Sequence, residues 1–252
     1  MKAMLTAAQP TTVFITGASS GLGRGLALHY AKSGATVHAA ARRQDELEKL
    51  AKESPNIVPL KLDVQDTPAL VKAIQGLGPL DMVIANAGIG RPTPAKKMDW
   101  EWVRRILDVN ATAACVTIAA ALPAMVERNA GHVVAISSLA GFRGLPGNAA
   151  YCASKAALRI FMESVRVDLA KTKVRATTIY PGFVKTELTA KNKFPMPFLM
   201  ELDDAVKVMA RGLARGAATI AYPLPMVALT RAMGLIPRAL YEPLASRMRV
   251  ER

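Results

Sequence analysis

Residues 12–23 read Thr-Val-Phe-Ile-Thr-Gly-Ala-Ser-Ser-Gly-Leu-Gly, a short apolar run followed at once by a glycine-rich turn. The run at 12–16 predicts a buried strand, and a helix is expected to follow at about 22–33. Glycines allow a tight turn and a close approach to a diphosphate, for which the helix start offers N–H donors. A turn of this kind between the first strand and the first helix is typical of dinucleotide-binding folds. The predicted cofactor contacts here are Gly17, Ser19, Ser20, Gly21, Leu22 and Gly23.

The rest of the chain repeats this alternation of strands and helices. Further strands are expected at 35–40, 57–62, 82–85, 132–136, 174–180 and 219–222. Helices are expected at about 45–53, 66–75, 99–128, 149–171 and 203–216. The pattern predicts an α/β fold with a doubly wound, Rossmann-like parallel sheet covered on both faces. We expect a single domain, with a core at about 11–190 and a substrate lid and less regular helical tail at about 189–252.

Composition limits the classes of function. The 252 residues are 51% hydrophobic and 21% charged, which suits one globular domain. The formal charge of +14 raises the possibility of nucleic acid, an anionic membrane or small anions as partners. Nucleic-acid binding is disfavoured because the basic residues are dispersed and aromatic residues make up only 5% of the chain.

The cysteines and histidines give no sign of a metal site. Cys115 and Cys152 fit neither a metal-ligand spacing nor a disulfide framework, so we expect no metal and a reducing, cytoplasmic setting. His29, His38 and His132 lie in helix and strand patterns without paired spacing and are interpreted as structural. The N-terminus does not have the pattern of a signal peptide.

Two arginines follow the second predicted strand. An acidic residue at this place would accept hydrogen bonds from a ribose hydroxyl, whereas Arg42 and Arg43 suit a 2′-phosphate. Ser19 and Ser20 could add hydroxyl donors. We therefore predict NADP(H) as the cofactor, the alternative being that both arginines are merely solvated.

Other cofactor candidates follow the third, fourth and sixth predicted strands, where ligands of such sheets bind. Asp63, next to Val64, could accept a hydrogen bond from an adenine amino group. The stretch Asn86-Ala87-Gly88 either contacts the cofactor or simply forms a turn. After the sixth strand, the hydroxyl of Thr186 could hold the nicotinamide amide. The remaining predicted contacts of that segment are Pro181, Gly182 and Val184.

The proton-handling residues are expected on and near the helix at 149–171. Tyr151 and Lys155 are four residues apart and share a helical face, so the ammonium is predicted to lower the pKa of the phenol. Ser138 supplies a hydrogen-bond donor for a carbonyl oxygen, and Asn110 a polar connection to solvent. By itself, a Tyr and a Lys at this spacing could be a surface pair. Together with Ser138, Asn110 and the glycine turn, however, the pair indicates the proton-handling part of a hydride-transfer site.

Taken together and in order, these motifs resemble those of the short-chain dehydrogenase/reductase family. The similarity rests on the glycine turn, Asn86-Ala-Gly, Asn110, Ser138, Tyr151-x3-Lys155 and Pro181-Gly182, and it spans about residues 11–190. The resemblance implies that Ser138, Tyr151, Lys155 and Asn110 carry catalysis, with Tyr151 as the proton donor. It further implies that Lys155 binds the ribose hydroxyls, and that dimers or tetramers form through the helices at about 99–128 and 149–171.

The expected activity is NADP(H)-dependent interconversion of a carbonyl and a secondary alcohol. The segment Phe194-Pro-Met-Pro-Phe-Leu-Met200 is apolar and can close over a substrate as a lid, which predicts a steroid, lipid-derived or aromatic ketone. The alternative is a binding protein that senses NADP(H) with little or no turnover. Arg143 is interpreted as a solvated residue rather than a substrate contact. The tail from Tyr222 either packs on the core or a partner subunit, which we favour, or lies on an anionic membrane.

Overall fold

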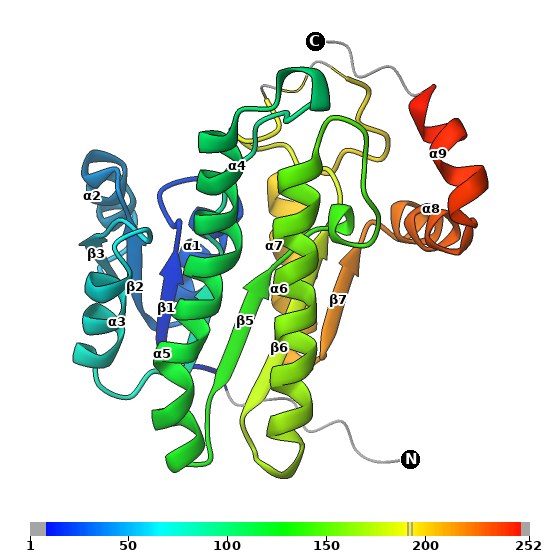
Figure 1. Ribbon diagram of the computed structural model, residues 1–252. Coiled ribbons are helices and arrows are strands. Elements are labelled where there is room, and N and C mark those ends of the chain that lie inside the picture. The colour runs from blue at the N-terminus through cyan, green and yellow to red at the C-terminus, as the bar shows by residue number, and fades with distance from the viewer. Residues whose placement is uncertain (1–8, 191, 193, 248–252) are drawn as a thin grey trace.

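The protein folds around a seven-stranded parallel sheet (Figure 1). The computed structural model describes residues 9–190, 192 and 194–247. The strand order is β3-β2-β1-β4-β5-β6-β7. The strands are β1 (Thr12–Thr16), β2 (Thr36–Ala41), β3 (Ile57–Lys61), β4 (Met82–Ala85), β5 (His132–Ile136), β6 (Arg175–Pro181) and β7 (Thr219–Tyr222).

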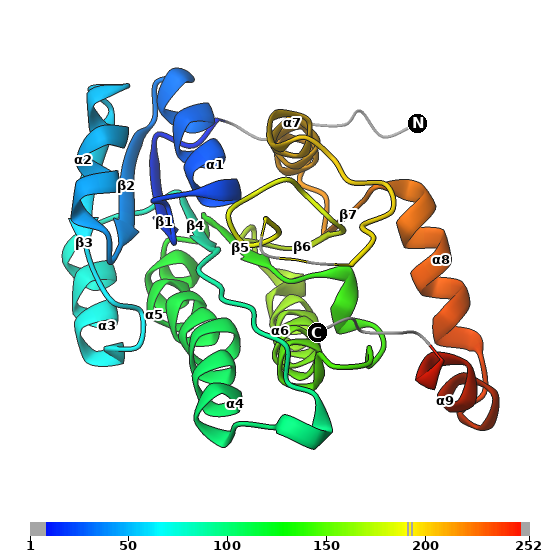
Figure 2. The ribbon, with the colours of Figure 1, turned by 90° about the horizontal axis from the view of Figure 1, so that it is seen from above.

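Helices cover both faces of the sheet (Figure 2). One face carries α1 (Gly21–Lys32), α2 (Gln44–Lys52) and α7 (Leu202–Ala214). The other carries α3 (Thr67–Gly76), α4 (Trp100–Leu107), α5 (Ala113–Glu127) and α6 (Ala149–Asp168). The last two helices are α8 (Leu224–Leu235) and α9 (Arg238–Ser246). This arrangement confirms the predicted doubly wound, Rossmann-like α/β fold.

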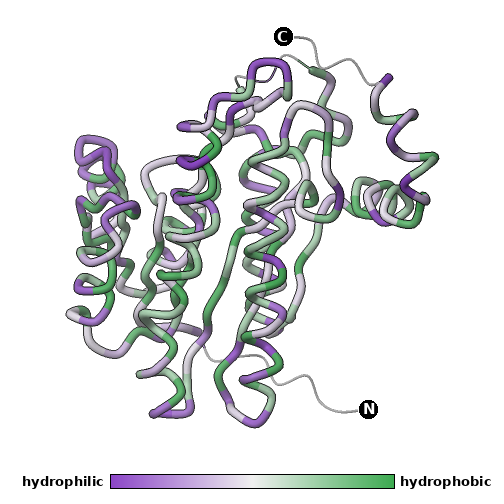
Figure 3. Tube along the Cα trace, viewed as in Figure 1, coloured by the Kyte–Doolittle hydropathy of each residue, from purple (hydrophilic) through white to green (hydrophobic). Residues whose placement is uncertain are grey.

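The strands at the centre of the sheet are buried because helices lie on both sides of them. Every residue of β4 and β5 is buried, and the hydropathy trace is green along β5 (Figure 3). Continuous apolar runs of this kind are expected of parallel strands that have no solvent-facing side. The core therefore has two layers, one between the sheet and α1 and α7, the other between the sheet and α5 and α6.

The stretch expected as one helix at 99–128 is divided. Asp99 caps α4 by accepting hydrogen bonds from the backbone N–H groups of Glu101 and Trp102, at 3.0 and 3.3 Å. A π-helical turn at Asp108–Thr112 then joins α4 to α5. By length and composition alone, the stretch Trp100–Glu127 could span a membrane, since an 18-residue window within it has a mean hydropathy of 1.7. Its inner side packs on β4 and β5, so in this fold it is a core helix of the domain.

The chain reverses its direction of travel across the sheet between β1 and β4. From β1 it proceeds to β2 and β3 on one side, and from β4 to β5, β6 and β7 on the other. A crevice forms at such a switch point, outside the carboxyl ends of the strands, and ligands bind there in folds of this class. The glycine turn after β1 and the segment after β4 border this crevice.

The helix and the strand expected after residue 190 are both present. Helix α7 packs on β6 and β7, and β7 pairs with β6 at the edge of the sheet. Beyond β7, α8 and α9 lie at the edge of the molecule (Figures 1 and 2). Helix α8 packs against β7 and against the short helix at Leu139–Gly141.

Candidate active site

The glycine turn is held against the end of β4 by Asn86. The side-chain amide of Asn86 donates hydrogen bonds to the carbonyls of Thr16 and Gly17, at 2.9 and 3.1 Å. A Cβ at Gly23 would lie 2.4 Å from both the Asn86 amide nitrogen and the Gly17 carbonyl oxygen. Gly17 and Gly21 have φ values of 67° and 55°, which disfavour other residues. Asn86 therefore helps to fix the glycine turn in place.

Arg43 lies beside this turn. Its Nε and Nη2 donate to the hydroxyl of Ser19, at 3.3 and 3.2 Å, and its Nη1 pairs with Glu187 at 3.0 Å. Arg42 is exposed at the end of β2. Of the two predicted arginines, Arg43 is thus the one that this geometry joins to the turn. The donor set of Arg43 and Ser19 fits a phosphate group.

The segment after β6 approaches the turn from the other side. A Cβ at Gly21 would lie 3.4 Å from a methyl carbon of Thr186, so the two segments face each other closely. Pro181 ends β6, and the N–H of Gly182 donates to the carbonyl of Tyr222 at 2.7 Å. Val184 is buried. These residues stand at the same edge of the sheet as the turn.

The two candidates after β3 lie at the same sheet edge, but on the outermost strand. The carboxylate of Asp63 accepts a hydrogen bond from the backbone N–H of Gln65 at 3.0 Å, and Val64 is buried.

The remaining predicted cofactor contacts lie at the glycine turn and after β4. Ser20 directly precedes α1 at the glycine turn, and Leu22 is partly buried in the first turn of that helix. Ala87 donates its backbone N–H to the Thr16 hydroxyl at 3.1 Å.

The structure brings Tyr151, Lys155 and Ser138 together at the end of β5. Lys155 is buried and donates from its ammonium to the carbonyl of Ile136 at 2.8 Å. The ammonium lies 5.9 Å from the centre of the Tyr151 ring. The Ser138 hydroxyl accepts from the N–H of Ala140 at 3.1 Å and reaches the carbonyl of Pro181 at 3.4 Å. Three predicted catalytic groups therefore share one small region.

Burial, rather than Lys155, has the largest effect on the phenol of Tyr151 in this geometry. Burial raises the pKa of Tyr151, and the opposing influence comes from the Ser138 hydroxyl. Burial also lowers the pKa of Lys155 to about 8, because an ammonium is poorly solvated there. Since the ammonium is turned towards Ile136, helical spacing alone overstated its contact with the phenol.

Asn110 is fully buried within the π-helical turn. Its Oδ1 accepts from the N–H of Ile89 at 2.8 Å, and its Nδ2 donates to the carbonyl of Ile89 at 2.9 Å. Nδ2 also donates to the hydroxyl of Ser154 at 3.2 Å. Both amide donors are thus used within the protein, and Asn110 fixes the segment after β4. The predicted connection to solvent through this side chain is restricted to one lone pair of Oδ1.

This segment after β4 passes close to the predicted catalytic residues Lys155, Asn110 and Tyr151. A Cβ at Gly88 would lie 3.6 Å from the Lys155 ammonium and 3.5 Å from Asn110 Oδ1. A Cβ at Gly90 would lie 3.9 Å from the Tyr151 ring. The two glycines thus let the backbone approach these predicted site residues, because a side chain at either position would occupy the space between them.

Sequence reasoning missed three residues of the region. Ser154 donates to the carbonyl of Tyr151 at 2.7 Å and accepts from Asn110. Ser137 donates to the carbonyl of Lys155 at 2.9 Å. Glu187, the partner of Arg43, is 144 residues distant in the sequence. The positions of the two serines beside predicted residues gave a signal, whereas nothing local indicated Glu187.

Arg143 does not behave as a solvated residue. Its guanidinium lies 4.1 Å from the centre of the Tyr241 ring and donates to the carbonyl of Ile236 at 3.1 Å. The Tyr241 hydroxyl donates in turn to the carbonyl of Gly144 at 2.6 Å. The loop between Ser138 and Tyr151 is therefore fastened to the end of α8 and to α9.

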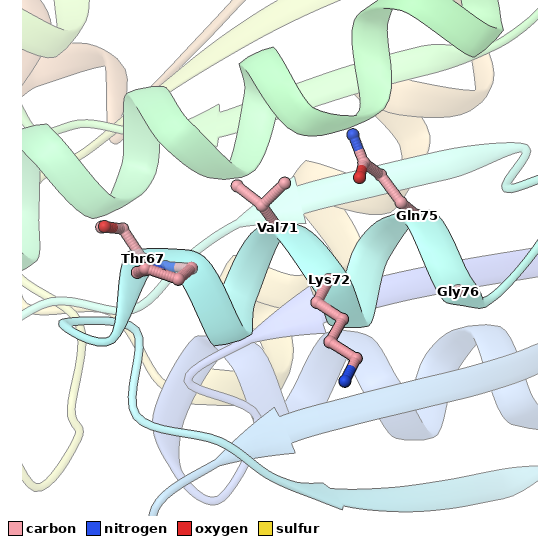
Figure 4. Close-up of a pocket in the computed structure, with 6 residues that line it drawn as sticks. Thr67, Val71, Lys72, Gln75 and Gly76 are labelled. Atoms are coloured by element: carbon pink, nitrogen blue, oxygen red, sulfur yellow. The ribbon is translucent and has the colours of Figure 1, made fainter.

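Metal-ligand clusters and surface hollows are two further kinds of candidate site among the described residues. Among residues 9–190, 192 and 194–247, no cluster of three or more potential metal ligands occurs. A hollow of about 660 Å³ runs along α3, where Val71 and Gln75 point to one side and Lys72 to the other (Figure 4). Its lining comes from that one helix and includes none of the predicted site residues, so it is a feature of the outer surface.

Comparisons with known proteins point in one direction. Residues 11–195 match the short chain dehydrogenase family. An uncharacterized oxidoreductase of Myxococcus xanthus is 52% identical over 246 residues, covering 94% of this chain and 97% of the relative. A short-chain dehydrogenase of Burkholderia cenocepacia, solved with NADP, has a TM-score of 0.82 at 26% identity, covering 94% and 98% of the two chains. One of Sphingobium yanoikuyae, solved with NADPH, has a TM-score of 0.80 at 26% identity, covering 96% and 97%.

Proposed function

The chain belongs to the short-chain dehydrogenase family, and from this premise we propose that it interconverts a carbonyl and a secondary alcohol with NADP(H). The observation that carries the proposal is the meeting of Tyr151, Lys155 and Ser138 at the end of β5, beside the segment that Asn110 holds. The glycine turn opens on the same edge of the sheet. A proton donor and a dinucleotide site at one edge suit hydride transfer.

The charge beside the glycine turn supports NADP(H) rather than NAD(H). Arg43 and Ser19 together offer charged and neutral hydrogen-bond donors to a 2′-phosphate. Arg42 adds a second positive charge close by. The structures from Burkholderia and Sphingobium contain NADP and NADPH, which agrees with this choice. Gly17, Gly21 and Gly23 would leave room for the diphosphate, and Thr186 would face the nicotinamide.

The catalytic side chains would handle the proton and orient the substrate. When bound, the nicotinamide supplies the hydride that a carbonyl carbon receives. The carbonyl oxygen would accept hydrogen bonds from the hydroxyls of Ser138 and Tyr151, and then the Tyr151 proton as its negative charge develops. Because burial raises the pKa of Tyr151, the phenol is protonated at neutral pH and suited to donate.

Lys155 would support this proton transfer through its positive charge. With a pKa of about 8, it is mostly an ammonium at neutral pH and can stabilise the phenolate that remains after the transfer. Asn110, through Ile89, would hold the backbone at Gly88 and Gly90 over the site and help to exclude water. In the direction of alcohol oxidation the same residues would act in reverse.

The lid supports an apolar substrate, of the class of steroids, lipid-derived ketones or aromatic ketones. The rings of Phe183 and Phe194 meet edge to face at 5.9 Å. Phe198 and Leu199 follow as exposed residues of the same segment. If this apolar segment closes over the site as a lid, it would favour a ligand with little hydrogen-bonding capacity.

A homodimer or homotetramer is the assembly that the outer helix faces support. Val126 of α5 and Ile160 and Val167 of α6 are exposed. These helices are the ones expected to form subunit contacts in the family, and apolar side chains there would be covered by a second copy.

The test is turnover with the purified protein. The absorbance of reduced nicotinamide should fall when NADPH is mixed with a panel of apolar ketones, and more slowly with NADH. Binding of NADPH should be measured separately, by quenching of protein fluorescence. Tight NADPH binding without turnover on a broad panel would contradict an enzymatic role and favour an NADP(H)-sensing protein.

A further inference from the structure

Helices α8 and α9 turn one side to the protein and leave large apolar residues on the other. Val227 and Thr230 of α8 and Tyr241 and Ala245 of α9 are buried. The outward leucines are Leu224, Leu229, Leu235, Leu240 and Leu244, of which Leu224 is 77% and Leu235 is 85% exposed. Single exposed leucines are common, but five on two consecutive helices form a surface that needs an explanation.

The outward leucines of α8 form a stripe with an arginine at its border. At 100° per residue, Leu224, Ala228 and Leu235 fall within about 40° of one another around the helix. Ala232 and Leu229 continue the apolar stripe, and Arg231 stands about 20° beyond its other border. Apolar side chains flanked by a basic residue are typical of helices that lie at a membrane surface.

The two helices are fastened in this orientation. Arg143 donates to carbonyls at the end of α8, and Tyr241 of α9 stacks on Arg143 and donates to Gly144. Because these contacts and the buried residues occupy the inward sides, rotating the leucines inward would break them. The apolar surface is therefore a fixed feature of the domain rather than a segment waiting to fold back.

The charge of this region argues for an anionic occupant. Residues 224–247 contain three arginines, at 231, 238 and 247, and one acidic residue, Glu242, which Arg238 binds at 2.7 Å. All three arginines are exposed, and the chain as a whole carries a formal charge of +14. Two copies of so basic a surface would repel each other, whereas an anionic lipid surface attracts it.

We propose that α8 and α9 dock the enzyme on an anionic membrane surface, with the outward leucines in the interfacial region and the arginines at the headgroups. The helices lie on the surface and do not span the bilayer. Docking would place the domain next to a phase in which apolar compounds dissolve. The proposal itself stands on α8 and α9 alone, and it holds whether or not the protein turns over a ketone.

Sedimentation with vesicles tests the proposal on the full-length protein. The wild type should sediment with vesicles of phosphatidylcholine and phosphatidylglycerol, remain in solution with phosphatidylcholine alone, and be released by salt. Leu224→Ser and Leu235→Ser should each lower the partition coefficient about tenfold. Arg231→Gln should lower it about fivefold. Val58→Ser, at a residue 42% exposed on β3, should leave it unchanged.

Each variant should also be examined by gel filtration and circular dichroism, since exposed substitutions should leave the fold intact. Absence of wild-type sedimentation with anionic vesicles overturns the proposal. So does equal sedimentation of Leu235→Ser and wild type. A wild-type oligomer that dissociates on Leu224→Ser and does not bind vesicles would instead assign this surface to a second copy.

Discussion

The side-chain amide of Asn110 donates a hydrogen bond to the hydroxyl of Ser154 across 3.2 Å, joining the π-helical turn to α6. Ser154 is completely buried and donates in turn to the carbonyl of Tyr151. Asn110 uses its other contacts on the backbone of Ile89. This chain of bonds links the segment after β4 to the helix that carries Tyr151, the proposed proton donor, and we therefore expect Ser154 to position that residue.

Replacing Ser154 should disturb catalysis more than folding. Ser154→Ala leaves one amide donor of Asn110 unsatisfied, and we expect kcat to fall about tenfold while the KM for NADPH stays unchanged. The buried neighbour Cys152 makes a matched control, and Cys152→Ala should keep kcat within about twofold. Steady-state kinetics on both variants decide the matter. An unchanged kcat for Ser154→Ala would remove it from the positioning network.

Arg43 should govern the choice of cofactor. Arg43→Ala removes the hydrogen bonds that a guanidinium gives to a phosphate, so the Kd for NADPH should rise about 30-fold and that for NADH change little. Arg211→Ala, an exposed substitution on α7, serves as the control. Fluorescence titration with both cofactors measures the effect. Equal weakening for NADPH and NADH would contradict recognition of the 2′-phosphate.

Glu187 gives a second, opposite test of the same site. Its carboxylate pairs with Arg43 at 3.0 Å and would compete with a phosphate for the guanidinium. Glu187→Gln should therefore tighten NADPH binding about threefold, without a matching gain for NADH. Weaker NADPH binding in this variant would mean that Glu187 positions Arg43 instead of competing for it.

Lys155 should lower the stability of the fold at neutral pH. Burial lowers its pKa from the ordinary 10.5 to about 8, so the folded state carries a poorly solvated ammonium below pH 8. This destabilisation is complete below about pH 8 and disappears as the pH rises towards about 10.5, where the unfolded chain also loses its proton. The free energy of unfolding of Lys155→Met at pH 7 should then be about 2 kcal/mol higher than that of the wild type, after allowing for the lost hydrogen bond to Ile136.

Urea unfolding at neutral and alkaline pH measures this difference. The advantage of Lys155→Met should shrink between about pH 8 and pH 10.5, and the variant should have lost its turnover. Lys72→Met, at an exposed position on α3, should change stability by less than about 0.5 kcal/mol. A Lys155→Met protein less stable than wild type at pH 7 would show that the ammonium is satisfied in the fold.

His132 should contribute to acid unfolding. Burial, reinforced by the positive charge of Arg175, lowers its pKa from 6.5 to about 3, and its Nε2 lies 2.8 Å from the Thr177 hydroxyl. The folded state keeps this imidazole neutral, whereas the unfolded chain protonates it below about pH 6.5. The free energy of unfolding therefore decreases as the pH is lowered from about 6.5 to about 3. Between neutral pH and about pH 4, the free energy of unfolding should decrease by about 3 kcal/mol less in His132→Gln than in the wild type. Identical acid profiles would contradict this linkage.

The sequence allowed the fold, and the grouping of Tyr151, Lys155 and Ser138, to be predicted because their signals are local. The apolar runs at β1, β4 and β5 matched the observed strands, since buried parallel strands have no polar face. The glycine turn and the Tyr151-x3-Lys155 pair lie within single elements or their immediate junctions. These features depend on few long-range contacts.

Features that depend on distant contacts were predicted poorly. Helical spacing could not show that the Lys155 ammonium turns towards Ile136, or that Arg43 rather than Arg42 meets Ser19. The π-helical turn around Asn110 arises from its contacts with Ile89 and Ser154, which no local pattern encodes. Arg143 was interpreted as solvated because its partners lie more than 90 residues away.

Tyr151→Phe shows whether Tyr151 is the proton donor for carbonyl reduction. The change removes one oxygen atom and keeps the ring that packs near Lys155. With a ketone that the wild type reduces, the variant should lose at least about 1,000-fold in kcat yet bind NADPH within about twofold of wild type. Reduction at the wild-type rate by Tyr151→Phe would contradict the account.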